Sequence, residues 1–285
     1  MASQDATRGI ALAVAAYGLF TLHDAGVKWL VQDLPVFQVL FVRTAVILAV
    51  CVAIGRTSLI LRAMKTPLRR KLTFRATINL IAWLCFNTAS RSLPLAQWLC
   101  LYFCAPLMVT VMAWRILRER VTQARWIAVT IGFAGVLFAC DPFGVTPSLA
   151  TLLVLISAAL WGYGVILMRQ IALHETTLLQ MLVTNAIFAL VTGVSCLWYW
   201  APVTWEQTVF MLATGAIGGI AQFLVFEAAR MTPASVLATV EYSALPWAFI
   251  LEYMIWRDFP SVPIFIGAGL IIVAGAVLVR GERQL

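Results

Sequence analysis

Asn79, Trp83 and Asn87 lie at intervals of four inside an apolar stretch of the sequence. On an α-helix this spacing places two amides and one indole along a single face. Amides can hydrogen-bond the ammonium or carboxylate group of a ligand, and an indole can pack against its apolar part. In a membrane the same amides could instead join neighbouring helices. Corresponding positions of the second half favour a cavity wall, since they again combine small or polar residues with an aromatic one: Gly218, Gln222 and Phe226.

A carboxylic acid, Glu241, lies eight residues after Pro233 in another apolar stretch. At such a depth it must be protonated or paired, because an isolated charge is costly in hydrocarbon. It is either a neutral packing group bonded across helices, or a group that binds a substrate amine or carries a proton. Tyr102 occupies the position of the first half that is equivalent to Glu241, and Trp161 also lies deep in its apolar segment. The predicted binding site therefore comprises Asn79, Trp83, Asn87, Tyr102, Trp161, Gln222, Glu241 and Tyr242.

Charged residues are also expected near the outer ends of the first two apolar segments. Asp24 and Arg43 lie at matching depths if each helical residue rises about 1.5 Å, so we predict a contact between them. This pair either holds two helices together or forms an outer gate that breaks when a cavity opens outward. His23 could titrate near neutral pH, but a lone histidine is more often a structural residue. Pro106 and Pro246 interrupt their helices and are predicted bending points.

The elements that must position these residues are membrane-spanning helices. Hydrophobic residues make up 62% of the chain and charged residues 11%, with a mean hydropathy of +0.95; soluble domains are roughly half apolar and about a quarter charged. A bilayer crossing takes about 20 helical residues. The sequence therefore predicts an all-α integral membrane protein with ten transmembrane helices. The expected spans are residues 8–30, 35–55, 73–92, 94–116, 124–141, 148–171, 175–200, 205–231, 233–256 and 261–280.

Basic residues are concentrated on one side of these spans. Seven fall between two long apolar runs, in a predicted basic loop at residues 56–75 that overlaps the start of the third span: Arg56, Arg62, Lys65, Arg69, Arg70, Lys71 and Arg75. Because Lys and Arg resist translocation, this distribution predicts that both termini are cytoplasmic. The net charge of +8 then reflects membrane topology, and no nucleic-acid-binding motif accompanies it.

The chain also repeats itself at an offset of 139 to 142 residues. The sequence RSLP at 91–94 recurs as RMTP at 230–233, and AP at 105–106 recurs as ALP at 244–246. This offset contains five spans, and an odd number forces the second copy to insert in the opposite orientation. Inverted repeats place a substrate site between them, near the bilayer midplane. The two predicted repeats are residues 1–143 and 144–285.

Several spaced residues make the chain resemble the drug/metabolite transporter superfamily. They are Arg43 on the second span, the Ala105-Pro106 pair followed by Arg118-Glu119, and a glycine-rich final span. Within the superfamily the chain is similar to the EamA family, and most of all to its YddG-type bacterial exporters of aromatic amino acids. The second half departs from the family pattern, with Asp258 where Glu is usual and Asn185 where the first half has an arginine.

This resemblance implies a transporter of the bacterial inner membrane that exports small amphipathic metabolites by alternating access. Aromatic and other hydrophobic amino acids are its expected substrates, and export of a drug or another metabolite is the alternative. An intramembrane enzyme or a non-transporting receptor is a further alternative, although no HExxH, paired-Asp or Ser–His arrangement supports an enzyme. We expect no cofactor and no metal ion. The lipid bilayer and a small-molecule substrate are the expected partners, and both proton-coupled and downhill transport are compatible with the sequence.

Overall fold

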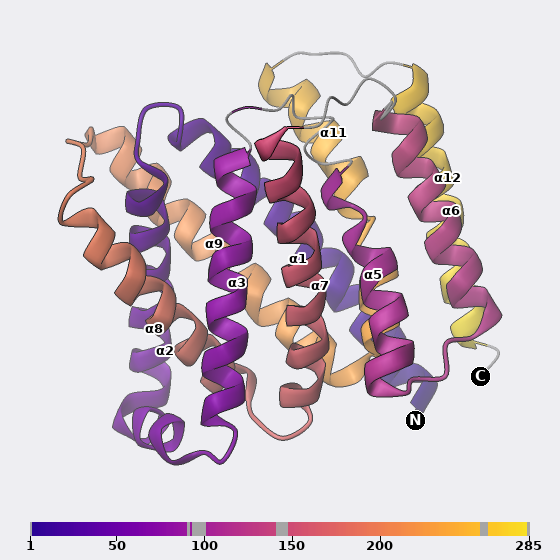
Figure 1. The fold of residues 1–285 in the computed structure, drawn as a ribbon, viewed down its shortest axis with the longest axis horizontal. Coiled ribbons are helices and arrows are strands. Elements are labelled where there is room, and N and C mark those ends of the chain that lie inside the picture. The colour runs from indigo at the N-terminus through magenta and orange to yellow at the C-terminus, as the bar shows by residue number, and fades with distance from the viewer. Residues whose placement is uncertain (1, 90–91, 93–100, 141–147, 257–261, 284–285) are drawn as a thin grey trace.

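The structure, a computed structural model, describes residues 2–89, 92, 101–140, 148–256 and 262–283. These residues form helices and contain no β-strand (Figure 1). The first half contains α1 (Ala2–Leu30), α2 (Val36–Lys65), α3 (Arg69–Ala89), α5 (Ala105–Met112), the π-helical turn η1 (Ala113–Leu117) and α6 (Gln123–Cys140). The second half contains α7 (Leu149–Ala172), α8 (Thr177–Cys196), α9 (Trp205–Met231), α10 (Ala234–Glu241), α11 (Ala244–Trp256) and α12 (Val262–Arg283).

Each expected span coincides with one of these helices or with a consecutive pair. α5 and η1 together occupy the fourth span, and α10 and α11 the ninth. Among the described residues, five segments are long and apolar enough to cross a bilayer: Thr7–Leu30, Val36–Lys65, Leu149–Ala172, Thr177–Cys196 and Trp205–Met231. The RSLP motif at 91–94 and the Asp258 position lie outside the described residues, apart from Ser92.

The predicted basic loop after the second span is largely helical in the structure. Arg56 adopts φ 50° and ψ −162°, which breaks α2 at the end of the expected span. The residues after it form a further short helix, in which Leu59 is buried. α3 then begins at Arg69, four residues before the predicted boundary, because the basic residues there continue the helix rather than end it. Arg75 therefore lies inside the bundle and not in the loop, which corrects the prediction.

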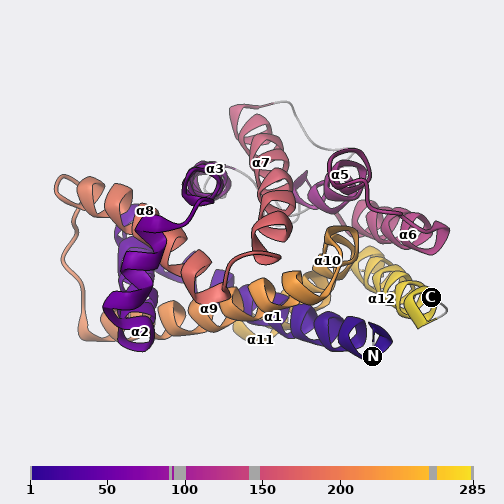
Figure 2. The same ribbon diagram turned by 90° about the horizontal axis from the view of Figure 1, so that it is seen from below.

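Helices of the two halves pack against each other in pairs. α1 packs on α9, α2 on α8, α3 on α7 and α6 on α12, and Figure 2 shows the α6–α12 pair at one side of the bundle. Small residues permit close approach. A Cβ atom on Gly135 of α6 would lie 2.8 Å from the backbone oxygen of Gly267 in α12.

Both termini lie at the same end of the bundle, together with the connection between α2 and α3 (Figure 1). We call this the terminal end. The fourth and ninth spans are both interrupted partway through: a turn at residues 103–104 precedes α5, and Tyr242 and Ser243 separate α10 from α11. Pro106 and Pro246 follow these breaks closely, as expected of residues that lack a backbone N–H. Their role as bending points remains a prediction.

Candidate functional site

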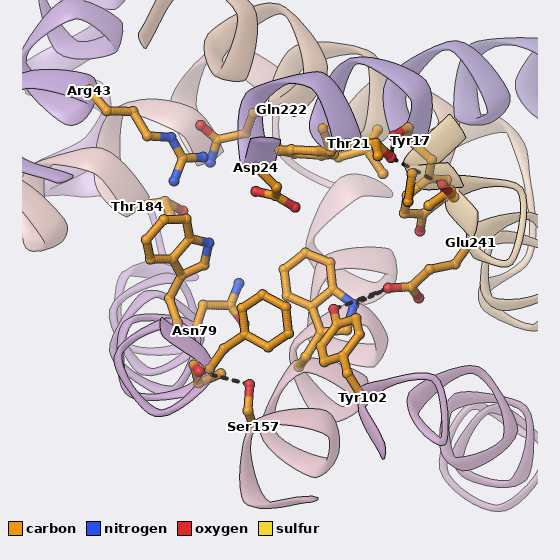
Figure 3. A pocket seen from close by; sticks show the side chains of 18 of the residues that line it. Tyr17, Thr21, Asp24, Arg43, Asn79, Tyr102, Ser157, Thr184, Gln222 and Glu241 are labelled. Carbon is orange, nitrogen blue, oxygen red and sulfur yellow. Dashed lines mark hydrogen bonds between the residues drawn. The ribbon is translucent and has the colours of Figure 1, made fainter. Parts of the chain in front are cut away.

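A central pocket lies between helices of the two halves (Figure 3). It contains about 1500 Å³ of space not filled by atoms, part of which is open to the surroundings. Its walls combine aromatic rings with a few polar and charged groups. The aromatic residues that line it are Tyr17, Phe20, Trp83, Phe86, Tyr102, Phe103, Trp161, Phe188 and Phe226. The polar and charged ones are Thr21, Asp24, Lys28, Arg43, Arg75, Asn79, Ser157, Thr184, Asn185, Gln222 and Glu241.

Two residues of the predicted α3 stripe line the pocket and the third does not. Asn79 and Trp83 face the cavity. The Nδ2 atom of Asn87 donates to the carbonyl oxygen of Trp83 at 2.9 Å, within the same helix. Asn79 is buried, and its Oδ1 atom has no hydrogen-bond partner among the described residues. Gly164 of α7 makes room for this amide, because a Cβ atom there would collide with Asn79 Oδ1.

Three other predicted site residues meet at one carboxyl group. Glu241 Oε1 accepts hydrogen bonds from Trp161 Nε1 at 2.9 Å and from the Tyr102 hydroxyl at 3.2 Å (Figure 3). The side chain is 3% exposed, and Oε2 has no partner among the described residues. Glu241 also ends α10, where the helix dipole is negative and disfavours an anion. The position therefore suits a carboxyl that holds a proton or binds a cation.

Tyr242 lies outside the pocket, although it is adjacent to Glu241. One residue along a helix rotates the side chain by about 100°, which turns Tyr242 away from the pocket. There it packs in a buried cluster with Phe103, Val129 and Leu245.

Gln222, the remaining predicted site residue, does line the pocket. Its Oε1 atom accepts a hydrogen bond of 2.9 Å from Asn185 Nδ2.

The predicted contact between Asp24 and Arg43 is absent. No ion pair joins them within the described part of the chain; Asp24 Oδ1 instead lies 2.9 Å from Nδ1 of His23. The Arg43 guanidinium lies over the Trp83 ring, 5.2 Å from its centroid. Asp24 and Arg43 both line the pocket, but from different walls (Figure 3). Matching depths fix the height of each residue in the bundle but not the rotation of its helix about the helix axis, which is why the predicted contact is wrong.

Arg75 is a pocket residue that the sequence prediction missed. It is 2% exposed, its Nε donates to the Gly164 carbonyl at 3.2 Å, and its Nη1 donates to Thr184 Oγ1 at 3.4 Å. Its guanidinium also lies over the Phe226 ring, 4.6 Å from the centroid. The signal was present in the sequence, because Arg75 precedes Asn79 by four residues and so begins the same stripe. Tyr17, Thr21, Ser157 and Thr184 line the pocket without any comparable signal.

The terminal end of the bundle is held together by polar contacts between the halves. Glu119 accepts hydrogen bonds from the backbone N–H groups of Ala234 at 3.0 Å and Ser235 at 3.4 Å, and from the Ser235 hydroxyl at 3.1 Å. Glu175 of the second half pairs with Arg62 at 3.1 Å and accepts a hydrogen bond from Thr66. Within the described ranges, no three His, Cys, Asp or Glu side chains are grouped closely enough to hold a metal ion.

Comparison with known proteins connects this architecture to membrane transport. Residues 7–140 match the EamA-like transporter family. Together with the apolar helices, this match makes the chain a multi-pass membrane protein. A solved crystal structure superposes with a TM-score of 0.78 over 99% of this chain and 98% of its own, at 16% identity, which supports the fold.

Curated relatives are transporters of several different metabolites. The chain is 25% identical to a riboflavin transporter of Vibrio cholerae over 74% of its length and 70% of the relative. It is 23% identical to the pseudopaline exporter CntI of Pseudomonas aeruginosa over 96% of its length and 97% of the relative. It is also 23% identical to an S-adenosylmethionine uptake transporter of Rickettsia prowazekii, over 93% of its length and 90% of the relative. These relatives favour metabolite transport in general over aromatic amino acids in particular.

Proposed function

We propose that the protein transports small amphipathic metabolites through its central pocket. The observation that carries this proposal is the composition of the pocket wall, in which aromatic rings from both halves surround a few buried polar groups. Such a wall suits a ligand with a flat apolar body and a small number of polar substituents. The resemblance to transporters over most of the chain supports the same function.

The substrate belongs, in this proposal, to a class wider than the aromatic amino acids that the sequence first suggested. Relatives named for riboflavin, S-adenosylmethionine and pseudopaline differ in their substrates and in the direction of transport. Aromatic amino acids remain candidates, because Trp83, Phe86, Tyr102 and Trp161 could stack on a ring. Riboflavin and S-adenosylmethionine should be tested beside the aromatic amino acids in a first assay, because relatives of the chain are named for them.

Alternating access between two inverted repeats is the proposed mechanism. The helix pairs are consistent with it: exchanging the halves converts the α1–α9 pair into the α7–α3 pair, and returns the α2–α8 and α6–α12 pairs to themselves. The contacts of Glu119 and Glu175 would close the terminal end. The pocket extends to Lys28, near the end of α1 that lies away from the termini. We therefore propose an outward-facing state, in a bacterial inner membrane with cytoplasmic termini.

Transport into and out of liposomes tests the proposed function. Riboflavin, S-adenosylmethionine, phenylalanine and tryptophan would each be offered in both directions. We expect at least one to move, and W83A and E241Q to slow it by roughly tenfold or more, since each removes a central wall contact. W198A is the matched control, because Trp198 is 72% exposed and lies outside the pocket. If no compound moves, the proposed function is wrong. If W83A and E241Q transport at the normal rate, the proposed binding site is wrong.

A further inference from the structure

The Arg43 side chain is buried in the pocket wall and has no hydrogen-bond partner among the residues that the structure describes. It is 6% exposed, and its Nε atom is buried with no acceptor among the described residues. No ion pair compensates its charge within the same part of the chain, where Asp24 is bonded to His23. A guanidinium has five N–H donors, and leaving them unsatisfied away from water is costly. The protein thus maintains a cationic donor group that its own described side chains do not satisfy.

The surroundings of Arg43 orient this group toward the cavity. One face of the guanidinium is covered by the Trp83 ring, at 5.2 Å from the centroid. Gly218 of α9 allows close packing behind it, because a Cβ atom there would lie 3.1 Å from Arg43 Nε. The side chain of Gln222 lies on the same side of the pocket, but its Oε1 already accepts a hydrogen bond from Asn185 (Figure 3). The Nε atom is packed against α9, whereas Arg43 as a whole lines the pocket and none of its guanidinium nitrogens has a hydrogen-bond acceptor among the described residues. A ligand in the pocket can therefore supply acceptors to the two terminal nitrogens, Nη1 and Nη2.

Arg75 offers an internal comparison within the same pocket. It is also buried, yet it donates to the Gly164 carbonyl and to the Thr184 hydroxyl, so protein groups hold it in place. Neither of these acceptors carries a charge. Asp24 also lines the pocket and attracts Arg43 electrostatically, although it makes no ion pair with it. Two arginines against this one carboxylate leave the region electropositive, and low-dielectric walls strengthen such a field. Glu241 lies on the opposite side of the pocket, away from Arg43 (Figure 3).

We propose that Arg43 binds a carboxylate group of the transported metabolite. The inference rests on the proposed function and narrows its substrate class to aromatic or otherwise apolar carboxylates. A guanidinium recognises a carboxylate through two parallel hydrogen bonds, a geometry that a lysine cannot reproduce. The apolar body would then lie along Trp83 and Phe86, and an amino group, where the substrate has one, would point toward Glu241. Arg75 would add to the field without direct contact.

Binding of a matched pair of small ligands tests this site without requiring transport. The pair is 3-phenylpropionate and its neutral amide, which share the ring and chain and differ in charge. Affinity for the purified full-length protein in nanodiscs can be followed by tryptophan fluorescence. We expect the acid to bind roughly tenfold or more tightly than the amide, and R43Q to remove this preference. R43K, which keeps the charge but not the planar donors, should retain only part of it.

Two further measurements keep the test independent of folding. R115Q is the matched control, because Arg115 is an exposed arginine outside the pocket and its loss should leave the preference unchanged. 3-Phenylpropylamine should bind R43Q at least as well as it binds the unmodified protein, since a cationic ligand gains when Arg43 loses its charge. Equal binding of acid and amide, an unchanged preference in R43Q, or no binding of the acid at all would each overturn the proposal.

The transport assay separates this inference from the proposed function. If phenylalanine or tryptophan, which carry a carboxylate, moves and R43Q moves it at the same rate, transport stands and the carboxylate site at Arg43 is wrong. If the acid binds through Arg43 but no compound crosses the membrane, the site stands and the transport function is wrong.

Discussion

The contact between Glu119 and the start of α10 gives a quantitative test of alternating access. Glu119 comes from the first half, and its carboxylate accepts three hydrogen bonds from Ala234 and Ser235 of the second half. If the terminal end opens during transport, these bonds must break. E119A should therefore favour the state that is open at the terminal end, because it removes a contact made only when this end is closed.

The size of this shift follows from the role of Glu119 as a cap for α10. Loss of an N-terminal cap costs about 0.5–2 kcal/mol, and loss of a carboxylate at the positive end of a helix dipole costs typically about 0.3–1 kcal/mol. A combined loss of about 2 kcal/mol would change the ratio of the two states by roughly 30-fold, since about 1.4 kcal/mol corresponds to a factor of ten. A change of this size is readily measured.

The assay is the labelling rate of a cysteine placed at Val225, a pocket residue toward the terminal end of α9, in a background without native cysteines. In vesicles whose terminal side faces outward, an impermeant maleimide should label it up to roughly 30-fold faster in E119A. E206A is the control, because Glu206 also carries an acidic charge in the first turn of a helix but is exposed and away from this contact. An unchanged labelling rate in folded E119A protein would refute the reasoning.

Three more substitutions should affect stability in specific ways. W161F removes the 2.9 Å hydrogen bond to Glu241 and should lower the free energy of unfolding by about 0.5–1.5 kcal/mol, more than Y102F, whose bond is 3.2 Å; a larger loss in Y102F would contradict this. G135V should lower the thermal midpoint, because Gly267 blocks its Cβ, whereas G275A has open space and should be neutral or slightly stabilising; equal midpoints would contradict this. Q38L removes two 2.9 Å bonds to the Ala201 backbone and should increase hydrogen exchange around residue 201; unchanged exchange would contradict it.

The helices could be predicted from the sequence because bilayer thickness and hydropathy constrain span length strongly. The expected breaks near Pro106 and Pro246 follow from backbone chemistry alone. The kink at Arg56 could not be predicted in this way, since a positive φ at an arginine is uncommon and depends on tertiary context. Charged residues usually mark the end of a membrane span, so the sequence predicts a start of α3 four residues later than Arg69 and a loop position for Arg75; in the structure the basic residues continue the helix.

The candidate site was only partly accessible to sequence reasoning. Helical spacing identifies the face that carries Asn79 and Trp83, but it does not say how far along that face a cavity extends, so Asn87 was included in the predicted site although it lies outside the pocket. Spacing also gives no information about rotation between helices. The rotation of α1 and α2 about their axes, which residue spacing does not predict, keeps Asp24 apart from Arg43 in the structure.

Three buried polar atoms of the pocket wall lack partners among the described residues: Arg43 Nε, Asn79 Oδ1 and Glu241 Oε2. Each unsatisfied group lowers the stability of the empty protein, and all three residues line the pocket, so a ligand that bonds to their pocket-facing groups gains affinity by compensating buried polar side chains. Arg43 and Asn79 belong to the first half and Glu241 to the second. A substrate that reaches both sides therefore contacts both halves at once, and its binding energy depends on how they are arranged. This dependence is what alternating access requires, because a ligand shifts a conformational equilibrium only when it binds the two states differently.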